Sequence, residues 1–535
     1  TSATNSNPII KVRNKKNRKN KPFAVMSRDL NSTKSFAIIN EVEKRILSSS
    51  SRPIVLLNKN KKYYLSPAIS SFNTIGVMLP YTGFHISLLN FVQDHVLVMT
   101  SGNDTNMPII KDENKAVESL SDCADYFLIH DRKIFTPCDD SILKIIENVP
   151  ILIRGSRGIS PLKLTFQKKS SECILALGCE KNVTFSILYN SNCFLSQHIG
   201  NLYNIESYNY FKTMIDKSIK FLNQKEPSIF VCDQHPTLLS TKLAFDLSKK
   251  NKENSLVYQV QHHHAHMLSL MAEYDLTDMI GIVCDGVGYG LEGQIWGGEI
   301  FQCYNATEFE RIGHLNEQPM IGGDLATINP LRMVAGILLG QVDGIEKFLY
   351  NNLIHFPYSK RELDFIISTI TSTRDYPMTT STGRILDAVS SLLGICYKRT
   401  FEGEPAISLE SRSSNGKDIS IPIKIISNNI LDTTYLLKFI FENKDKFSIQ
   451  DLAYSAQVYI AKGLASIAID NALSSCINVI GFSGGVSQNK IITKIIKNEV
   501  EKNGIRFLLH KNIPPGDGGI SVGQAYFALN KLLQK

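Results

Sequence analysis

The sequence contains no C-x-x-C pair, and its ten cysteines are scattered singly, as at Cys123, Cys232 and Cys396. Zinc sites built on cysteine use closely spaced pairs, and small disulfide-bonded domains are much denser in cysteine. The spacing therefore argues against a zinc finger and against a disulfide framework. It favours a protein of the reducing cytoplasm.

Long apolar runs are missing as well. No run approaches the roughly 18 residues typical of a membrane-spanning helix, so we expect no membrane partner. The N-terminal stretch TSATNSNP lacks the apolar core of a signal peptide. Because the first residue is Thr rather than Met, we expect a truncated or processed start.

Excess charge of one sign is confined to one short segment. Residues 11–21 hold seven basic residues and no acidic one, and the rest of the chain is nearly neutral although the net charge is +8. This distribution indicates a local anion site or a solvated arm, and argues against a broad nucleic-acid surface. The strand-like stretch KPFAVMSRDL follows directly, which favours an anion site with Lys16 and Arg18 facing a phosphate group.

A chain of 535 residues is too long for one hydrophobic core, so two or three domains are expected. Strand-like runs alternate with helical stretches over residues 22–160, and a second α/β pattern begins at residue 173. The polar, Lys- and Ser-rich segment 161–172 is interpreted as a linker or domain edge. These patterns predict an α/β protein with a first domain over 1–160 and a second over 173–535.

Two histidines one helical turn apart, His262 and His266, precede an apolar strand that ends at Asp285. Side chains at i and i+4 share a helix face, so both imidazoles can reach one ion. Such a pair alone is more often a surface feature, but Asp285 and Asp517, each beside a glycine-rich turn, favour a metal site. Two histidines and two aspartates are compatible with iron, zinc or manganese.

Glycine turns follow two of the predicted strands, at MIGIVCDGVGYG (279–290) and at NVIGFSGGVSQN (478–489). Backbone N–H groups at such turns and at the following helix start favour phosphate binding. We expect the glycines of both turns to contact a nucleotide between two α/β lobes; these are Gly286, Gly288, Gly484 and Gly485.

Several long motifs, in order along the chain, resemble one family. They are KPFAVMSRDL, GVMLPYTGFHISLL, LVMTSGN, CDDSILKI and RGSRGISP, then QHHHAHMLSLMAE, CDGVGYGLEGQIWGGEIF, GRILDAVSSLLGIC, FSGGVSQNK and PPGDGGISVGQA. They closely resemble the HypF-type carbamoyltransferases of NiFe-hydrogenase maturation over nearly the whole chain. The resemblance implies an α+β YrdC-like domain followed by a two-lobed ASKHA or Kae/TsaD-like domain.

The family's chemistry has two steps. The YrdC-like domain joins ATP, accompanied by Mg²⁺, and a carbamoyl group from carbamoyl phosphate or carbamate into carbamoyl-adenylate. The second domain transfers that group to the C-terminal cysteine of the partner protein HypE. The resemblance implies a nucleotide site in the first domain, with the K-x-R pair Lys16 and Arg18 as catalytic residues that contact the triphosphate; its other members are Thr100, Ser101, Asn103, Ser141 and Arg157. Asn489 matches, together with Gly484 and Gly485, the family's adenosine and phosphate turn in the second domain.

The resemblance also assigns roles in the second domain. His262, His266, Asp285 and Asp517 match the family's metal ligands residue by residue. Arg384 and Asp387 in GRILDAV match catalytic residues that bind ribose or position the substrate, although the same segment is compatible with an ordinary amphipathic core helix. His263 and His264 fall on other helix faces and are interpreted as supporting residues.

The chain departs from the family in four places. The N-terminal acylphosphatase and zinc-finger modules are not in it, and the first strand and helix of the YrdC-like domain are expected to be missing. Pro137 stands where Arg is expected, and Asn201 where the family has Asp. We therefore expect a fragment, a split protein whose missing portion is a separate partner, or a decayed copy.

Three other functions remain open. The first is O-carbamoylation of a small-molecule hydroxyl, although antibiotic carbamoyltransferases resemble the reverse domain order. The second is threonylcarbamoylation of tRNA, which would favour H-x-E-G-H in place of HHHAH and a broad basic face. The third is a non-catalytic binding protein, against which the retained metal ligands argue.

Overall fold

The computed structural model describes residues 1–222, 225–251, 255–372, 376–427 and 429–534. It consists of two compact units. Unit 1 comprises Thr1–Val260 and His510–Lys535, and unit 2 comprises Gln261–Leu509. The unit boundaries lie inside the predicted second domain, so the predicted domain limits at 160 and 173 stay a prediction.

The first part of unit 1 is a mixed sheet in the order β4-β1-β3-β2-β5-β6. β1 runs parallel to β3 and β2 parallel to β5, whereas the other neighbours are antiparallel. The elements are α1 (Ser6–Lys15), β1 (Ala24–Ser27), α2 (Leu30–Lys34), α3 (Glu41–Leu47), β2 (Ile54–Asn58), β3 (Thr74–Met78), α4 (Gly83–Phe91), β4 (Val96–Met99), α5 (Glu113–Leu120), β5 (Ile142–Ile146) and β6 (Val149–Arg154).

Local sequence explains where these short helices begin. Asp29 caps α2 by accepting the Ser32 N–H, and Asn40 forms a reciprocal capping box with Glu43 at the start of α3. Alternate residues of the strands face inward, so Val25, Val55 and Val77 are fully buried in one core.

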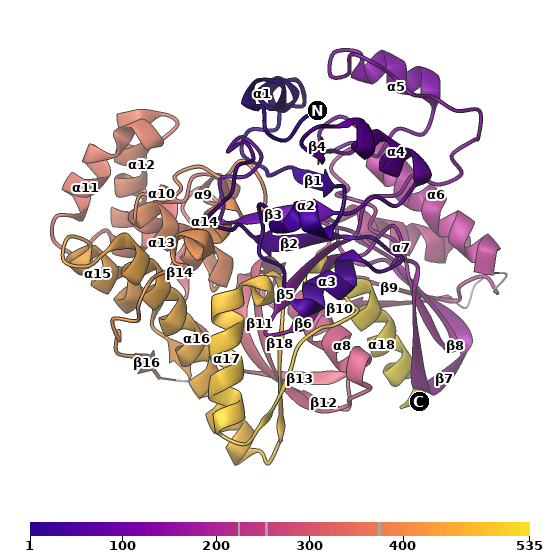
Figure 1. The fold of residues 1–535 in the computed structure, drawn as a ribbon. Helices are drawn as coiled ribbons and strands as arrows, with labels where there is room; N and C mark the ends of the chain where they lie inside the picture. Colours follow the sequence, from indigo (N-terminus) through magenta and orange to yellow (C-terminus); the bar gives the residue numbers. More distant parts are fainter. Residues whose placement is uncertain (223–224, 252–254, 373–375, 428, 535) are drawn as a thin grey trace. The chain divides into compact units, whose positions relative to one another are not determined.

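A second sheet of unit 1 has the order β10-β9-β7-β8. Helix α18, from the C-terminal segment of the unit, packs on β7, β8 and β9 (Figure 1). The elements are β7 (Leu162–Ala176), β8 (Ser186–Leu195), α6 (Ile205–Leu222), β9 (Ile229–Asp233), α7 (Leu239–Lys250), β10 (Leu256–Val260), η3 (Asp517–Gly519) and α18 (Ile520–Leu533).

The segment predicted as a linker or domain edge, 161–172, is not irregular chain, because residues 162–172 belong to β7; its place at a domain edge stays a prediction. This strand pairs with β8 in an antiparallel hairpin interrupted by register shifts. Leu162, Leu164 and Phe166 alternate with the exposed Lys163 and Thr165, which is the period of a strand with one solvated face. The polar composition therefore reflects that solvated face.

Unit 2 is built on one larger sheet, with a main order of β16-β17-β13-β12-β11-β18-β19. Helices α8 and α16 both pack on β11 (Figure 1). The strands are β11 (Met279–Tyr289), β12 (Ile295–Tyr304), β13 (Glu308–Leu315), β14 (Gln318–Pro319), β15 (Met378–Thr379), β16 (Ile425–Ile426), β17 (Ile430–Leu431), β18 (Val479–Ser483) and β19 (Arg506–Leu508).

The region 325–475 is mostly helical, as predicted. The helices of unit 2 are α8 (His262–Tyr274), α9 (Asp324–Ile328), α10 (Leu331–Leu338), α11 (Ile345–Asn351), η1 (Leu353–His355), α12 (Ser359–Thr371), α13 (Thr382–Leu392), α14 (Glu404–Arg412), α15 (Thr433–Asn443), α16 (Ile449–Ser474), η2 (Gly485–Gln488) and α17 (Lys490–Lys502).

Helix α16 is the one helix in the described ranges that is long and apolar enough to pass a length-and-composition test for a membrane span. Within its most apolar window, 83% of the residues are buried inside the protein. Its apolar side chains therefore contribute to the core of unit 2, which is the usual reason for such a helix in a globular fold.

Candidate functional site

The two histidines expected to bind metal lie on the first turns of α8. The helix begins after Gln261, whose side chain accepts the His264 N–H at 2.8 Å and donates to the Tyr289 carbonyl at 2.8 Å. These bonds join the start of α8 to the end of β11. The Nε2 atoms of His262 and His266 are 3.6 and 3.3 Å from Asp285 Oδ2, so the predicted grouping of these three residues is present.

Asp285 lies where β11 leaves its regular pairing with β12. Cys284 pairs with Gly298 and Gly288 with Trp296, so residues 285–287 form a bulge. Bulges of this kind redirect side chains next to functional sites. Burial opposes ionisation of Asp285, but hydrogen bonds from the two histidines hold the pKa of its carboxyl well below the ordinary value.

The three side chains fit a transition-metal ion. One ligand atom from each of His262, His266 and Asp285 lies within 4.8 Å of the others, and all three side chains are largely shielded from solvent. Two imidazole nitrogens and one carboxylate oxygen suit zinc, iron or manganese. The fourth predicted ligand, Asp517, belongs to unit 1 at the start of η3, and its ligand role stays a prediction.

The neighbouring histidines have different surroundings. His263 lies beneath the bulge, where a Cβ added to Gly288 would be 2.3 Å from its ring. Burial, together with His262 and His266, lowers the pKa of His263 well below its ordinary value. His264 packs against Phe309 with ring centroids 4.4 Å apart, which makes it a core residue.

The two glycine turns of unit 2 lie next to each other. β11 and β18 are parallel neighbours, so the chain beyond Ser483 reaches Asp285. A Cβ on Gly485 would lie 2.9 Å from Asp285 Oδ1, and one on Gly484 would lie 2.2 Å from the Cys284 carbonyl. Gly484 also has φ +89°, which other residues rarely adopt. Glycine at position 484 is therefore required by the close approach of two backbones, whereas glycine at position 485 leaves room for the Asp285 side chain. Nucleotide contacts by Gly286, Gly288, Gly484 and Gly485 stay predictions.

Asn489 is held in a structural role. Its side-chain oxygen accepts the N–H groups of Ile491 and Ile492 at 3.0 and 3.1 Å, which caps α17. Its amide group donates to Gln457 at 2.8 Å. A nucleotide contact through this side chain would compete with the cap, and that contact stays a prediction.

The predicted catalytic pair lies on α13. Arg384 and Asp387 form a buried ion pair of 2.7 Å, with side chains 4% and 1% exposed. A Cβ on Gly286 would lie 4.0 Å from Arg384 Nη2, so the guanidinium is next to the bulge that carries Asp285. The position suits a residue that orients a bound group, and the catalytic role stays a prediction.

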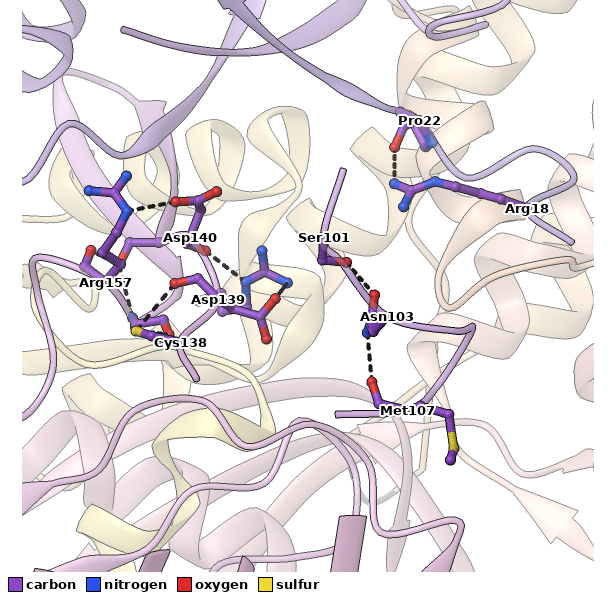
Figure 2. Close-up of polar contacts among 12 residues, drawn as sticks. Arg18, Pro22, Ser101, Asn103, Met107, Cys138, Asp139, Asp140 and Arg157 are labelled. Atoms are coloured by element: carbon purple, nitrogen blue, oxygen red, sulfur yellow. Dashed lines mark hydrogen bonds and ion pairs between the residues drawn. The ribbon is translucent and has the colours of Figure 1, made fainter. Parts of the chain in front are cut away.

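The nucleotide loop predicted in unit 1 is held by Lys16. The Lys16 ammonium donates to the carbonyls of Ser101 and Asn103 at 2.9 and 2.5 Å. Ser101 Oγ donates to Asn103 Oδ1 at 2.6 Å, and the Asn103 amide donates to the Met107 carbonyl at 2.6 Å (Figure 2). Thr100 is exposed at the end of β4. Lys16 therefore binds the loop that was expected to bind the phosphate.

Arg18 is also occupied by the protein. Its guanidinium donates to the Pro22 carbonyl (Figure 2). It also donates to the Lys21 carbonyl and lies 4.7 Å from the centre of the Phe23 ring. Burial, with Arg13 and Arg154 nearby, lowers the pKa of Arg18 to about 10. These contacts order residues 18–23, and a phosphate contact stays a prediction.

Ser141 and Arg157 form a second polar group. Arg157 donates to Asp140 Oδ1 at 2.7 Å and stacks 3.6 Å above the Tyr81 ring (Figure 2). Ser141 is fully buried and donates to the Arg157 carbonyl at 3.0 Å. The Ser141 hydroxyl thus holds the turn that contains Arg157. Nucleotide contacts by Ser141 and Arg157 stay predictions.

A pocket of about 170 Å³ in unit 1 lies between the nucleotide loop and the end of β8. Ser101 and Asn103 line it, together with Lys21, Arg154 and Asp139, which sequence reasoning did not select. Arg154 and Asp139 form an ion pair of 3.7 Å. The signal for Arg154 is a cation at the end of the strand-like run VPILIR, where it is the first residue of the family motif RGSRGISP.

Pro137 and Asn201, the two substituted positions among the departures from the family pattern, also line this pocket. The Pro137 carbonyl accepts hydrogen bonds from Gln197 and Tyr210, each at 2.8 Å. The Asn201 side chain accepts the Asn182 N–H at 2.8 Å. Neutral groups at these two positions are thus integrated into the wall of the pocket.

Comparisons with known proteins agree along the whole chain. Residues 1–156 match the Sua5/YciO/YrdC family described as telomere recombination, residues 169–273 match the HypF Kae1-like domain, and residues 281–524 match the second subdomain of the carbamoyltransferase Kae1-like domain. The "Probable carbamoyltransferase HypF" of Methanocaldococcus jannaschii is 41% identical over 98% of this chain and 68% of its own length. Carbamoyltransferase HypF of Synechocystis sp. is 31% identical over 98% of this chain and 69% of its own length.

Solved structures give the same result. The structure of T. kodakarensis HypF matches with a TM-score of 0.94 and 36% identity, over 99% of this chain and 70% of that one. A full-length HypF in its phosphate- and nucleotide-bound form matches with a TM-score of 0.92 and 33% identity, over 100% of this chain and 69% of that one. The matched proteins carry the predicted fold, a YrdC-like domain with Kae1-like domains. The chain therefore belongs to the HypF family of carbamoyltransferases.

Proposed function

We propose that this chain forms carbamoyl-adenylate from ATP and carbamate, whose oxygen attacks the α-phosphorus as pyrophosphate leaves, and then transfers the carbamoyl group to the C-terminal cysteine of a HypE-like partner in NiFe-hydrogenase maturation. The observation that carries the transfer step is the convergence of His262, His266 and Asp285 beside the Gly484–Gly485 turn. Carbamoyl phosphate or carbamate is the proposed source of the carbamoyl group.

The pocket of unit 1 is the proposed adenylate-forming site. Two cationic side chains, Lys21 and Arg154, line this pocket, and so do the polar side chains of Ser101 and Asn103. Cations directed at transferring phosphoryl oxygens stabilise the charge that develops there. The relative that was solved with nucleotide and phosphate supports a nucleotide in this family.

Transfer then takes place at the histidine–aspartate cluster. The cysteine sulfur attacks the carbamoyl carbon, the bond between that carbon and the phosphate oxygen breaks, and AMP leaves with the electron pair as the thiol proton is released. His262, His266 and Asp285, with Asp517 as the proposed fourth ligand, would hold a divalent ion that acts as a Lewis acid. Backbone N–H groups of the glycine turns would bind the adenylate phosphate.

The two half-reactions can be tested separately. Exchange of labelled pyrophosphate into ATP, dependent on carbamoyl phosphate or carbamate, reports adenylate formation. We expect Arg154→Met to lose exchange, and Asp285→Asn to keep exchange but lose transfer to a thiol. Lys11→Met, which removes an exposed cation from α1, serves as the control. Absence of exchange in the wild type, or its loss in Asp285→Asn, would contradict the proposal.

A further inference from the structure

The bulge that carries Asp285 needs support from outside the sheet. Between the Cys284–Gly298 and Gly288–Trp296 pairs, residues 285–287 have no register partner on β12, where only Gly297 lies between the two paired residues. Buried backbone carbonyls require hydrogen-bond donors, and a bulge leaves them without ladder partners. Whatever supplies those donors also determines how the Asp285 side chain points.

Ser381 supplies a donor to this bulge. Its hydroxyl lies 3.1 Å from the Asp285 carbonyl and makes a shorter contact with the Gly286 carbonyl. The same oxygen accepts the Arg384 N–H at 3.1 Å, as the N-cap of α13. A serine hydroxyl has one proton to donate and two lone pairs, so a single group serves the bulge and the helix start together. Ser381 is fully buried.

Two glycines allow this close approach. A Cβ on Gly383 would lie 3.0 Å from the Gly286 Cα, and one on Gly297 would lie 2.8 Å from the Asp285 carbonyl and 2.9 Å from the Ser381 Cα. The start of α13 therefore lies in backbone contact with the bulge. Any shift of α13 is transmitted to Asp285 because no flexible side chain separates them.

A second anchor lies one residue earlier. The Thr380 hydroxyl donates to the buried Glu299 carboxylate, which also accepts the N–H groups of Gly297 and Gly298 at 3.0 and 3.1 Å. Arg311 pairs with the other oxygen of Glu299 at 2.6 Å. The segment before α13 is thus fixed to β12, the strand opposite the bulge.

From these contacts we infer that Ser381 is a positioning residue that holds the Asp285 bulge and thereby aligns the Asp285 carboxylate with His262 and His266. The inference rests on the proposed role of Asp285 as a metal ligand. Groups that orient a metal ligand without touching the ion change its affinity by about 10- to 100-fold when they are removed. Ser381 also connects the cluster to Arg384, on the first turn of α13.

The test compares two serines that both cap helices. Ser448 caps α16 by accepting the Asp451 N–H at 3.1 Å and lies outside the bulge. Hydrogen exchange of residues 284–290 in metal-free protein reports the bulge directly, and zinc affinity measured against a chelator reports the ligand geometry. We expect Ser381→Ala to speed exchange there and to weaken zinc binding by about 10- to 100-fold, whereas Ser448→Ala changes neither.

Two further variants separate the bulge contact from helix capping. Glycine is an acceptable N-cap residue, so Ser381→Gly keeps most of the cap and should behave like Ser381→Ala in both assays. Ser381→Thr keeps the hydroxyl and should restore slow exchange and most of the zinc affinity. The cobalt-substituted protein should show an altered visible spectrum in the alanine and glycine variants alone.

The outcomes distinguish this inference from the proposed function. If hydrogen exchange at residues 284–290 keeps the wild-type rate in Ser381→Ala and Ser381→Gly, the positioning role is overturned, whatever the zinc and cobalt measurements show. Faster exchange with unchanged zinc affinity and cobalt spectrum would overturn the alignment of Asp285. A wild-type protein that binds no zinc or cobalt would contradict the metal role in the proposed function, while the exchange data would still decide whether Ser381 holds the bulge.

Discussion

Replacing Lys16 by methionine tests whether this residue acts on the nucleotide loop or on the nucleotide itself. Methionine keeps most of the stem and removes the ammonium group. The wild-type ammonium donates to the Ser101 and Asn103 carbonyls at 2.9 and 2.5 Å, and these contacts join segments 85 and 87 residues apart in the sequence. Burial lowers the pKa of Lys16.

The size of the effect follows from those two bonds. A hydrogen bond to a charged group contributes about 1.5–3 kcal/mol, and partial exposure to solvent reduces that value. Lys16 is half-buried. We therefore expect Lys16→Met to lower the free energy of unfolding by about 2 kcal/mol, and to speed hydrogen exchange at residues 101–107. Lys11→Met is the matched control, because Lys11 on the same helix makes an exposed pair of 3.4 Å with Asp125.

The assay combines urea denaturation, hydrogen exchange and calorimetric titration with ATP. If Lys16 acts through the loop, Lys16→Met lowers the ATP affinity and the hydrogen-exchange protection of the loop together. Lys11→Met leaves the free energies of ATP binding and of loop opening unchanged within about 0.5 kcal/mol. Unchanged stability and loop exchange, with a large loss of ATP affinity, would refute this reasoning. That result would restore the direct phosphate contact expected from the sequence.

Three further predictions concern the two sites. Gly485→Ala should weaken zinc binding with a modest loss of stability, because its Cβ would meet only the Asp285 side chain. Gly484→Ala should lower the thermal midpoint much further, because its Cβ would lie 2.2 Å from the backbone carbonyl oxygen of Cys284; equal midpoints for the two variants would contradict this. Chelation should lower the thermal midpoint of the metal-loaded wild type and leave His266→Ala unchanged, since an ion bound to the folded state stabilises it. Burial lowers the pKa of His198 from 6.5 to about 4, so the free energy of unfolding should fall as the pH is lowered through that interval. In urea denaturation at pH 7 and pH 5, His198→Gln should show a smaller fall than the wild type.

The local parts of the site could be predicted from the sequence because they depend on short-range periodicity. The spacing of His262 and His266 determines that both imidazoles lie on one face of α8, and an apolar run ending at Asp285 indicates a buried strand. The strand–glycine-turn–helix pattern at 478–489 likewise predicts the turn that the structure places beside Asp285. Family resemblance then connected these separate motifs.

The supporting contacts could not be predicted, because their partners are distant in the sequence. Ser381 and Asp285 are 96 residues apart, and no periodicity relates them. A serine before the helical run TGRILDAV does indicate an N-cap, but not that its hydroxyl also reaches a bulge in another strand. Lys16 was interpreted as a phosphate contact because a sequence does not show which carbonyls a cation will meet.

Mass spectrometry of a HypE-like partner with a C-terminal cysteine, after incubation with this protein, ATP and carbamoyl phosphate, shows directly whether the carbamoyl group reaches the thiol. We expect the added mass of one carbamoyl group on that cysteine, lost in Asp285→Ala and retained in Lys11→Met. An unmodified partner, with a small-molecule hydroxyl carbamoylated in its place, would contradict this expectation.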